Sequence, residues 1–215
     1  MEKEILRWIF GFFDDMENSF QSVRQHPKAL PKTFEEIISA VLYLSTCPVI
    51  HCIGCGKSRH VAQKVSSTFS SCGIESYAPS CEELLHGSCT TLHEGDGFIF
   101  FTKSGNTEEI WNVLNCIDTT KCHCVFITCS DVFAQCGDTR HGKTVLLRSE
   151  DEFDSLNLLP TKSAMMMMLI GDIICACIAK EKGTTYKEMH VAHPYGFAGD
   201  MLRRDVQLKE RRIFE

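Results

Sequence analysis

The sequence predicts an α/β fold in which a parallel sheet is covered by helices on both faces. Short, nearly continuous apolar runs, which are typical of buried parallel strands, alternate along the chain with segments of helical periodicity. Each segment between two runs is long enough for a crossover connection. The chain has 215 residues, 44% of them hydrophobic and 23% charged, which fits one globular domain and excludes disorder, collagen and coiled coil as its overall class.

The first 47 residues are predicted to form a helical lead-in. Apolar residues recur at helical spacing over residues 5–23, and a break bounded by prolines covers residues 26–31. Thr33 and Glu36 then form the two ends of a capping box, with apolar positions behind it as far as Leu44. We therefore expect residues 1–47 to precede the sheet as helices.

Five apolar runs predict the strands of the main domain, in residues 48–53, 74–77, 97–102, 122–128 and 143–147. Helical patterns fill the gaps between them, in residues 58–72, 81–86, 107–117 and 132–136. A long helix over residues 161–182, whose four consecutive methionines are interpreted as core filler, and a short helix over 185–189 follow. The main domain is predicted to span residues 48–200, with a C-terminal tail at 201–215.

Neither a membrane span nor a signal peptide is predicted. The most apolar stretch, residues 165–179, is interrupted by Gly171 and Asp172 and stops short of the roughly 20 residues that a span needs. The first residues, Met-Glu-Lys-Glu, lack the basic region and cleavage site of a signal peptide. We expect a protein that is made and kept in the cytoplasm.

The balance of charge argues against a nucleic-acid partner. The chain carries 22 basic and 28 acidic side chains, a formal net charge of −6, whereas nucleic-acid binders usually present a basic stripe. Basic residues cluster in the tail, at Arg203, Arg204, Lys209, Arg211 and Arg212. Acidic residues interleave with them, so we interpret the tail as a solvated helical face.

Thirteen cysteines do not predict a disulfide framework. Their number is odd, and several lie inside apolar runs, where a free cysteine behaves as a small hydrophobic residue. Cys52 and Cys55 form a Cys-x-x-Cys motif, but no second pair follows at zinc-site spacing, and Cys52 lies within a predicted strand. We therefore predict no metal site and a reducing compartment.

The loop after the first strand, Gly-Cys-Gly-Lys-Ser at residues 54–58, is a candidate anion site. A P-loop would need glycine at the position of His51, and a dinucleotide fingerprint would need glycine or alanine at Arg59. What remains is a glycine turn at a helix start, with backbone N–H groups, a hydroxyl and a lysine. The alternative is a tight turn with a solvated lysine.

The loop after the third strand offers similar chemistry. Residues 102–109 place hydroxyl and amide donors at a helix start, with two glutamates in the first turn. These donors can cap the helix without any ligand. Because ligands of such sheets bind outside the carboxyl ends of the strands, we expect the two loops to shape one polar pocket.

These motifs, in this order, resemble the sugar isomerase (SIS) domain and, within it, the arabinose 5-phosphate isomerase branch. The resemblance covers residues 49–199 and rests on Gly54-x-Gly56-Lys57-Ser58, Glu83-x-x-His86-Gly87, Ser104-Gly-x-x-x-Glu109, Glu152 ahead of Leu159-Pro-Thr161-x-Ser163, and His193-Pro-x-Gly196. The family implies a flavodoxin-like three-layer α-β-α sandwich with a five-stranded parallel sheet. It also implies phosphosugar ligands and homodimers or homotetramers with sites at subunit interfaces.

In the isomerase branch the resemblance implies interconversion of D-ribulose 5-phosphate and D-arabinose 5-phosphate without a cofactor. The functional positions that carry over are Lys57, His86, Glu109, Glu152 and His193. The phosphate-binding positions, with the glycine of the first turn, are Gly56, Ser58, Ser104, Asn106, Thr107, Thr161 and Ser163.

Isomerisation through an enediolate needs a base, an acid for the oxygens and a cation near the developing charge. Glu152 or His193 could be the base, and His86 or His193 could move the proton. Lys57 could stabilise the negative charge, and Glu109 could orient Lys57 or a sugar hydroxyl.

Some positions depart from the family pattern. An acid after Gly87 is missing, Tyr195 is bulky, and Lys103 adds a cation beside the phosphate loop. The paired nucleotide-sensing (CBS) domains of longer members are expected to be absent, since the sequence ends at Glu215. Two alternatives stay open: a non-catalytic SIS module that binds a phosphosugar or sugar nucleotide to regulate a partner, and an isomerase for another sugar phosphate.

Overall fold

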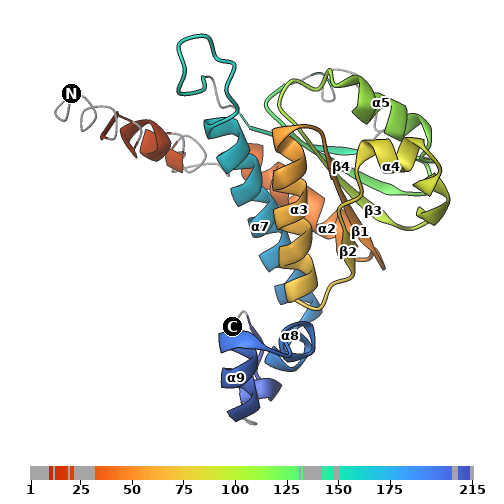
Figure 1. The fold of residues 1–215 in the computed structure, drawn as a ribbon, viewed down its shortest axis with the longest axis vertical. Helices are drawn as coiled ribbons and strands as arrows, with labels where there is room; N and C mark the ends of the chain where they lie inside the picture. Colours follow the sequence, from red (N-terminus) through yellow and green to blue (C-terminus); the bar gives the residue numbers. More distant parts are fainter. Residues whose placement is uncertain are drawn as a thin grey trace.

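The fold is a three-layer α-β-α sandwich around one parallel sheet (Figure 1). The computed structural model describes residues 10–11, 13–18, 20–21, 32–130, 132, 142–147, 151–204 and 208–213. Five strands form the sheet in the order β2-β1-β3-β4-β5, and every neighbouring pair is parallel. The strands are β1 (Ile50–Gly54), β2 (Ser76–Tyr77), β3 (Gly97–Thr102), β4 (His123–Thr128) and β5 (Lys143–Leu146). The predicted fold class and all five strands are confirmed.

Helices cover both faces of the sheet. The described helices are α2 (Lys32–Leu44), α3 (Lys57–Ser71), α4 (Cys81–Leu85), α5 (Glu108–Asn115), α7 (Lys162–Lys182), α8 (Tyr186–Ala192) and α9 (Gly196–Arg204), with 3₁₀ turns η1 (Ser88–Thr91) and η2 (Leu208–Glu210). Strand residues alternate between two buried clusters: Ile99 and Phe101 pack with α2, α3 and α7, whereas Phe98 and Phe100 pack with α4 and α5. This alternation explains why the strands read as continuous apolar runs.

Helix α7 is the central helix of its layer. It is the one described helix that is long and apolar enough to cross a membrane, but half of its most apolar window is buried inside the molecule. At Gly171 an added Cβ would lie 2.6 Å from Val65 Cγ2, so α7 and α3 are in close contact. Met166 and Met167 are buried in this layer as predicted, whereas Met165 is 43% exposed.

The C-terminal segment lies apart from the loops that follow the strands. Helices α8 and α9 sit beyond the last turns of α3 and α7 (Figure 1). The prediction of a helical tail is wrong at Arg211 and Arg212, because the chain there is not helical and an isolated bridge joins Arg212 to Thr185 at the start of α8. The Arg211 carbonyl accepts the Tyr186 N–H at 2.9 Å, which satisfies a backbone donor at the helix start.

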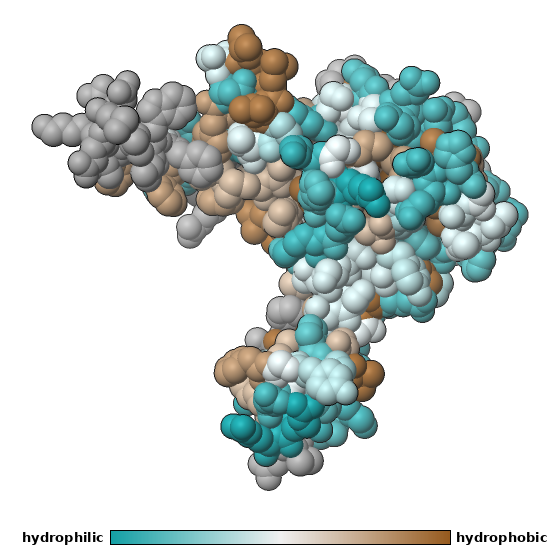
Figure 2. All heavy atoms as spheres, viewed as in Figure 1, coloured by the Kyte–Doolittle hydropathy of each residue, from teal (hydrophilic) through white to brown (hydrophobic). Residues whose placement is uncertain are grey.

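The loop ahead of α7 presents a patch of apolar side chains at its tip. Figure 2 shows these atoms gathered at the end of the molecule where α7 begins. Leu156, Leu158 and Leu159 are each more than half exposed there. We call this patch the leucine loop.

Some predicted elements lie outside the described residues. The break at 26–31 lies outside them entirely, as does the helix at 132–136 apart from Val132. Of the helix at 5–23, the described residues between 10 and 21 are helical. The domain limits 48–200 and 201–215 stay predictions.

Candidate functional site at the carboxyl edge of the sheet

The β1–α3 loop is a tight turn that opens onto a helix N-terminus. An added Cβ at Gly54 would lie 2.5 Å from the Ser58 carbonyl oxygen, so the strand end lies against the first turn of α3. Gly56 has φ of 57°, a backbone conformation that favours glycine. No described side chain caps α3, whose first residues are Lys57 and Ser58. This N-terminus therefore offers uncapped N–H groups and a positive helix dipole to an anion.

The β3–α5 loop is fixed by hydrogen bonds to its buried Gly105, and it exposes polar side chains. Thr102 Oγ1 accepts the Gly105 N–H at 3.2 Å, and Trp111 Nε1 donates to the Gly105 carbonyl at 2.9 Å. Ser104 and Asn106 are exposed on the outer side. Thr107, the N-cap residue of α5, makes no described side-chain cap hydrogen bond. A second helix N-terminus is therefore open to a ligand.

The two loops leave the sheet side by side. Strands β1 and β3 are neighbours in register, with Gly54 opposite Phe101. Glu109, at the second position of α5, is close enough to Cys55 for its charge to oppose ionisation of that thiol. The structure thus brings the predicted residues of the two loops to one edge: Gly56, Lys57, Ser58, Ser104, Asn106, Thr107 and Glu109.

Helix α4 adds a third element to this edge. Its first residue, Cys81, places Sγ 3.2 Å from Cys55 Sγ. A capping box between Ser80 and Glu83 fixes the start of α4. His86 is the C-cap residue and is exposed. Since α4 has 5 residues and rises about 7.5 Å, His86 stays near the same rim.

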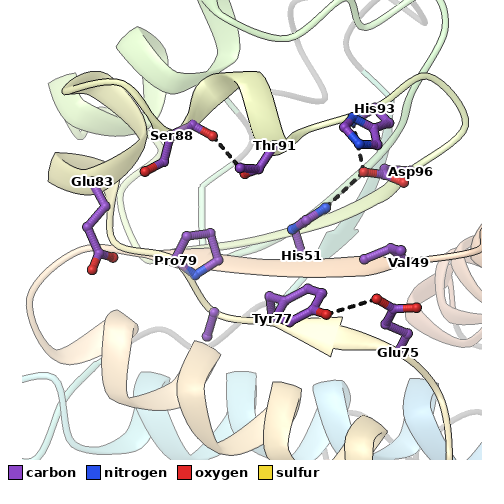
Figure 3. Close-up of a pocket in the computed structure, with 11 residues that line it drawn as sticks. Val49, His51, Glu75, Tyr77, Pro79, Glu83, Ser88, Thr91, His93 and Asp96 are labelled. Carbon is purple, nitrogen blue, oxygen red and sulfur yellow. Dashed lines mark hydrogen bonds and ion pairs between the residues drawn. The ribbon is translucent and has the colours of Figure 1, made fainter.

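A separate cavity of about 660 Å³ lies on the α4 side of the sheet, toward the β2 edge (Figure 3). None of the predicted site residues lines it. The buried His51 ring stacks on Phe98, and its Nε2 lies 2.9 Å from Asp96 Oδ2, which also accepts the His93 N–H. The other charged residues in the described part of the lining are the carboxylates Glu75 and Glu83, and no lysine or arginine is among them. This excess of carboxylates disfavours a phosphate, which is usually held by lysine, arginine or backbone N–H groups.

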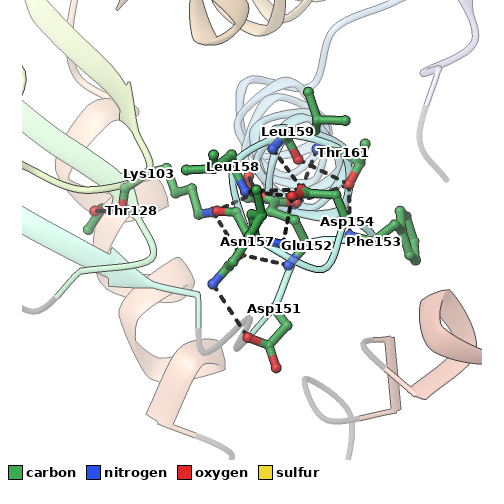
Figure 4. Close-up of polar contacts among 12 residues, drawn as sticks. Lys103, Thr128, Asp151, Glu152, Phe153, Asp154, Asn157, Leu158, Leu159 and Thr161 are labelled. Carbon is green, nitrogen blue, oxygen red and sulfur yellow. Dashed lines mark hydrogen bonds and ion pairs between the residues drawn. The ribbon is translucent and has the colours of Figure 1, made fainter.

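Glu152 is buried in a network of donors ahead of α7 (Figure 4). Its Oε2 accepts the N–H groups of Thr161 at 3.0 Å and Ser163 at 3.1 Å, and Oε1 accepts the Ser163 hydroxyl. Lys103 Nζ lies 3.0 Å from Oε1 and 3.1 Å from Asn157 Oδ1. We call these residues, Lys103, Glu152, Asn157, Thr161 and Ser163, the Glu152 clasp.

The clasp keeps Glu152 ionised and supplies hydrogen-bond donors to both of its carboxylate oxygens. Burial opposes ionisation most strongly, but the hydrogen bonds from Ser163 and Lys103 together outweigh it, so the pKa of Glu152 lies below its ordinary value. Thr161 and Ser163, which the sequence assigns to phosphate, here give their N–H groups to Glu152. The Lys103 ammonium is directed to Glu152 and Asn157 within the clasp.

Sequence reasoning missed Lys103 and Asn157 as members of this network. Asn157 has φ of 56°, and its side-chain oxygen accepts the Glu152 N–H at 2.9 Å. Asparagine is one of the few residues besides glycine that adopts this conformation readily. A turn signal was available in Asp154, whose carboxylate accepts backbone N–H groups of Leu158 and Leu159.

His193 is the predicted site residue that one chain does not bring to this edge. Its Nε2 lies 3.2 Å from the hydroxyl of Ser71, and its Nδ1 lies 3.1 Å from the Met189 carbonyl oxygen. Ser71 is the last residue of α3 and Lys57 is the first. The two are about 21 Å apart along the helix axis. Within one chain, His193, the C-cap residue of α8, therefore lies at the opposite end of α3 from Lys57. Figure 1 shows α8 beyond that end of α3.

Comparison with known proteins identifies the family. The SIS domain family matches residues 43–172. The arabinose 5-phosphate isomerase KdsD of Francisella tularensis is 28% identical over 156 residues, which are 72% of this chain and 46% of that protein. The chain spans about half the length of the curated relatives that it matches.

Solved structures share the fold. The Escherichia coli CFT073 protein c3406, in complex with arabinose 5-phosphate, has a TM-score of 0.77 and 23% identity, and covers 90% of this chain and 100% of its own. The sugar isomerase domain of the RpiR transcription factor from Sphaerobacter thermophilus has a TM-score of 0.62 and 16% identity, with 90% and 96% covered. The chain, related in sequence to arabinose 5-phosphate isomerases, belongs to the SIS domain family.

Proposed function

We propose that the protein is a phosphosugar aldose–ketose isomerase that interconverts D-ribulose 5-phosphate and D-arabinose 5-phosphate in the cytoplasm, without a cofactor. The observation that carries the proposal is the meeting of two uncapped helix N-termini, those of α3 and α5, beside Lys57 at one edge of the sheet. The sequence relationship to arabinose 5-phosphate isomerases supports this choice of substrate.

The phosphate is assigned to the start of α5. Exposed Ser104 and Asn106 flank the uncapped N-terminus, and the helix dipole adds a positive field there. Ser58 and the Gly56 turn supply donors from the neighbouring loop. Thr161 and Ser163 hold this arrangement through Glu152, which fixes the path of the chain ahead of α7.

Lys57 is assigned to the sugar end of the ligand. A cation beside C1 and C2 stabilises the enediolate more than the neutral ground state, so it lowers the barrier. Glu109, from the adjacent helix start, orients the Lys57 ammonium or a sugar hydroxyl. His86, on the rim formed by α4, moves a proton between the two sugar oxygens.

The base is assigned to His193 of a second copy. In arabinose 5-phosphate the base removes the proton on C2, the enediolate forms, and the proton returns to C1 to give ribulose 5-phosphate. Glu152 is a poor base in this arrangement, because its oxygens accept five hydrogen bonds or ion contacts and its pKa is lowered. It acts as a positioning residue through Lys103.

The same geometry supports a second copy, since His193 and Lys57 lie at opposite ends of α3 and could share a site only across two chains. The leucine loop, close to the carboxyl edge, offers apolar surface that a second copy would cover. Ile38 and Leu42 add exposed apolar side chains on α2. We therefore propose a homodimer or homotetramer whose sites are shared between copies.

A non-catalytic SIS module is the alternative. It is favoured by the Glu152 carboxylate, which accepts hydrogen bonds within the chain and is therefore a poor base. It is also favoured by the fold shared with a transcription factor. Such a module would bind a phosphosugar or sugar nucleotide and regulate a partner without turnover.

Proton exchange in deuterated solvent separates the two functions. The protein is incubated in D₂O with arabinose 5-phosphate and a panel of pentose and hexose phosphates, and the spectra are followed by NMR. An isomerase replaces the C2 proton of its substrate by deuterium and forms the ketose. Saturable binding without exchange of any sugar phosphate would reject the enzyme and support the regulatory module.

A further inference from the structure

Two thiols from different loops meet at the candidate site. Cys55 lies in the β1–α3 turn, and Cys81 opens α4, which follows the neighbouring strand β2. Their sulfur atoms are 3.2 Å apart, although the residues are 26 positions apart in the sequence. Cys81 is buried in the α4–α5 cluster, whereas Cys55 is partly exposed at its margin. An oxidant can therefore reach the pair through Cys55.

The surroundings of the two thiols shift their pKa values in opposite directions. The contact with Cys81 lowers the pKa of the Cys55 thiol most, the positive charge of Arg59 helps, and burial and Glu109 oppose it, so the net shift is downward. The same contact, together with burial, raises the pKa of Cys81. Cys55 also precedes the positive end of α3. Cys55 is thus the thiol of the pair that ionises more readily, and Cys81 is the one that holds its proton more firmly.

We propose that Cys55 and Cys81 form a thiol-oxidation site, at which a peroxide converts the two thiols into a disulfide. Resting on the proposed function, we infer further that this disulfide suppresses phosphosugar turnover by displacing the Lys57–Ser58 helix start. Reduction by a dithiol restores the site.

The reaction balances in two steps. The Cys55 thiolate attacks one peroxide oxygen, the O–O bond breaks, and a sulfenic acid forms as the second oxygen leaves and takes a proton as water. The Cys81 thiol then attacks the Cys55 sulfur, the S–O bond breaks, and the departing hydroxide takes the Cys81 proton as a second water. The two thiols lose two electrons and two protons, and hydrogen peroxide is reduced to two waters.

The disulfide would move the loop more than the helix. A disulfide bond is about 2.05 Å long, so the two sulfur atoms must approach by about 1.1 Å. Cys81 is packed among buried residues of the α4–α5 cluster, whereas no described atom beyond the chain neighbours lies within 4 Å of a Cβ placed on Gly56. We therefore expect the β1–α3 turn, and not α4, to move when the disulfide forms. A misplacement of about 1 Å at a catalytic loop can lower turnover about 10²-fold.

Other described cysteines provide internal comparisons. Cys72 and Cys175 lie 4.0 Å apart, but both are buried and away from solvent. Cys52, the other residue of the Cys-x-x-Cys motif, is fully buried on the opposite face of the sheet from Cys81. Cys116 is exposed. We expect the cross-link to join Cys55 to Cys81 and to leave Cys72 and Cys175 as thiols.

The test combines peptide mapping with activity. The full chain is treated with hydrogen peroxide, free thiols are alkylated, and peptides are mapped by mass spectrometry without reduction. We expect a Cys55–Cys81 cross-link, a fall of about 10²-fold in kcat/KM for arabinose 5-phosphate, and recovery with dithiothreitol. The Cys81→Ser variant should keep its starting activity through the treatment, whereas the control Cys116→Ser should lose activity as the wild type does.

Different results would overturn the oxidation site, its effect on turnover and the proposed function. Absence of the cross-link, while exposed Cys116 is oxidised, would overturn the oxidation site. A complete cross-link with unchanged kcat/KM would overturn its effect on the loop. If the untreated protein turns over no sugar phosphate, the proposed function fails, while the mapped cross-link still decides whether the oxidation site exists.

Discussion

Replacement of Lys103 by methionine tests whether the Glu152 clasp holds the site together. Methionine keeps an unbranched apolar stem but removes the ammonium that lies 3.0 Å from Glu152 Oε1. Coulomb's law gives about 5.5 kcal/mol for unit charges at that distance in an effective dielectric constant of about 20. Water screens part of this, because the Lys103 side chain is 32% exposed while that of Glu152 is 1% exposed. We expect the free energy of unfolding to fall by about 2–3 kcal/mol at pH 7.

The loss should depend on pH in a defined direction. The pKa of Glu152 lies below its ordinary value of 4.5 in the folded protein, so the charged clasp stabilises the fold above that value and stops doing so as pH falls through the folded pKa. In Lys103→Met the ammonium no longer offsets burial, while the Ser163 hydrogen bonds remain, so the pKa of Glu152 should be higher than in the wild type. A protonated carboxyl needs no counter-charge, so the deficit of the variant should shrink below about pH 4.5.

Urea denaturation followed by tryptophan fluorescence measures this deficit. With a slope of about 2 kcal/mol per molar urea, the midpoint of Lys103→Met should fall by about 1–1.5 M at pH 7. Lys121→Met is the matched control, because Lys121 pairs with Glu94 at the surface, where both side chains are about half exposed or more. Its unfolding free energy should change by less than about 1 kcal/mol. An unchanged midpoint for Lys103→Met, or a deficit equal at pH 7 and pH 4, would refute this reasoning.

Three further predictions concern packing, phosphate binding and assembly. Gly171→Val places side-chain atoms against Val65 and should lower stability by about 1–3 kcal/mol, measured by calorimetry; an unchanged melting temperature would contradict the close packing of α3 and α7. Ser104→Ala should raise KM about tenfold with little change in kcat, whereas a fall in kcat at constant KM would exclude a role in ground-state phosphate binding. Leu158→Asp should lower the molar mass measured by light scattering, and an unchanged mass would remove the leucine loop from the interface.

The strands and the positions of the two loops could be predicted from the sequence because their causes are local. A parallel strand buried on both faces must be apolar throughout, and the carboxyl ends of adjacent parallel strands share an edge. The loops at residues 54–58 and 102–109 are therefore predictable as neighbours, and the pairing of β1 with β3 confirms this. The helical interpretation of the tail agrees with α9 at Arg203 and Arg204, but it does not predict that this helix begins at Gly196, whose φ of 77° is typical of a turn.

The clasp and the position of His193 depend on contacts between distant segments. Lys103 and Glu152 meet because Asn157 turns the intervening loop through a left-handed conformation, which no periodicity signals. His193 contacts Ser71, 122 residues earlier, through the packing of α8 beyond the end of α3. The Cys-x-x-Cys motif likewise draws attention to Cys52, although strand geometry sends it to the opposite face and brings Cys81 to Cys55.

Subunit complementation tests the shared isomerase site most directly. Lys57→Met and His193→Asn should each lower turnover of arabinose 5-phosphate by about 10²–10⁴-fold. When the two inactive variants are unfolded together and refolded, a mixed dimer combines intact Lys57 from one copy with intact His193 from the other. Random mixing leaves about one quarter of the sites intact, so we expect recovery of about 25% of wild-type activity. No recovery from a mixture shown by native mass spectrometry to contain mixed dimers would contradict it.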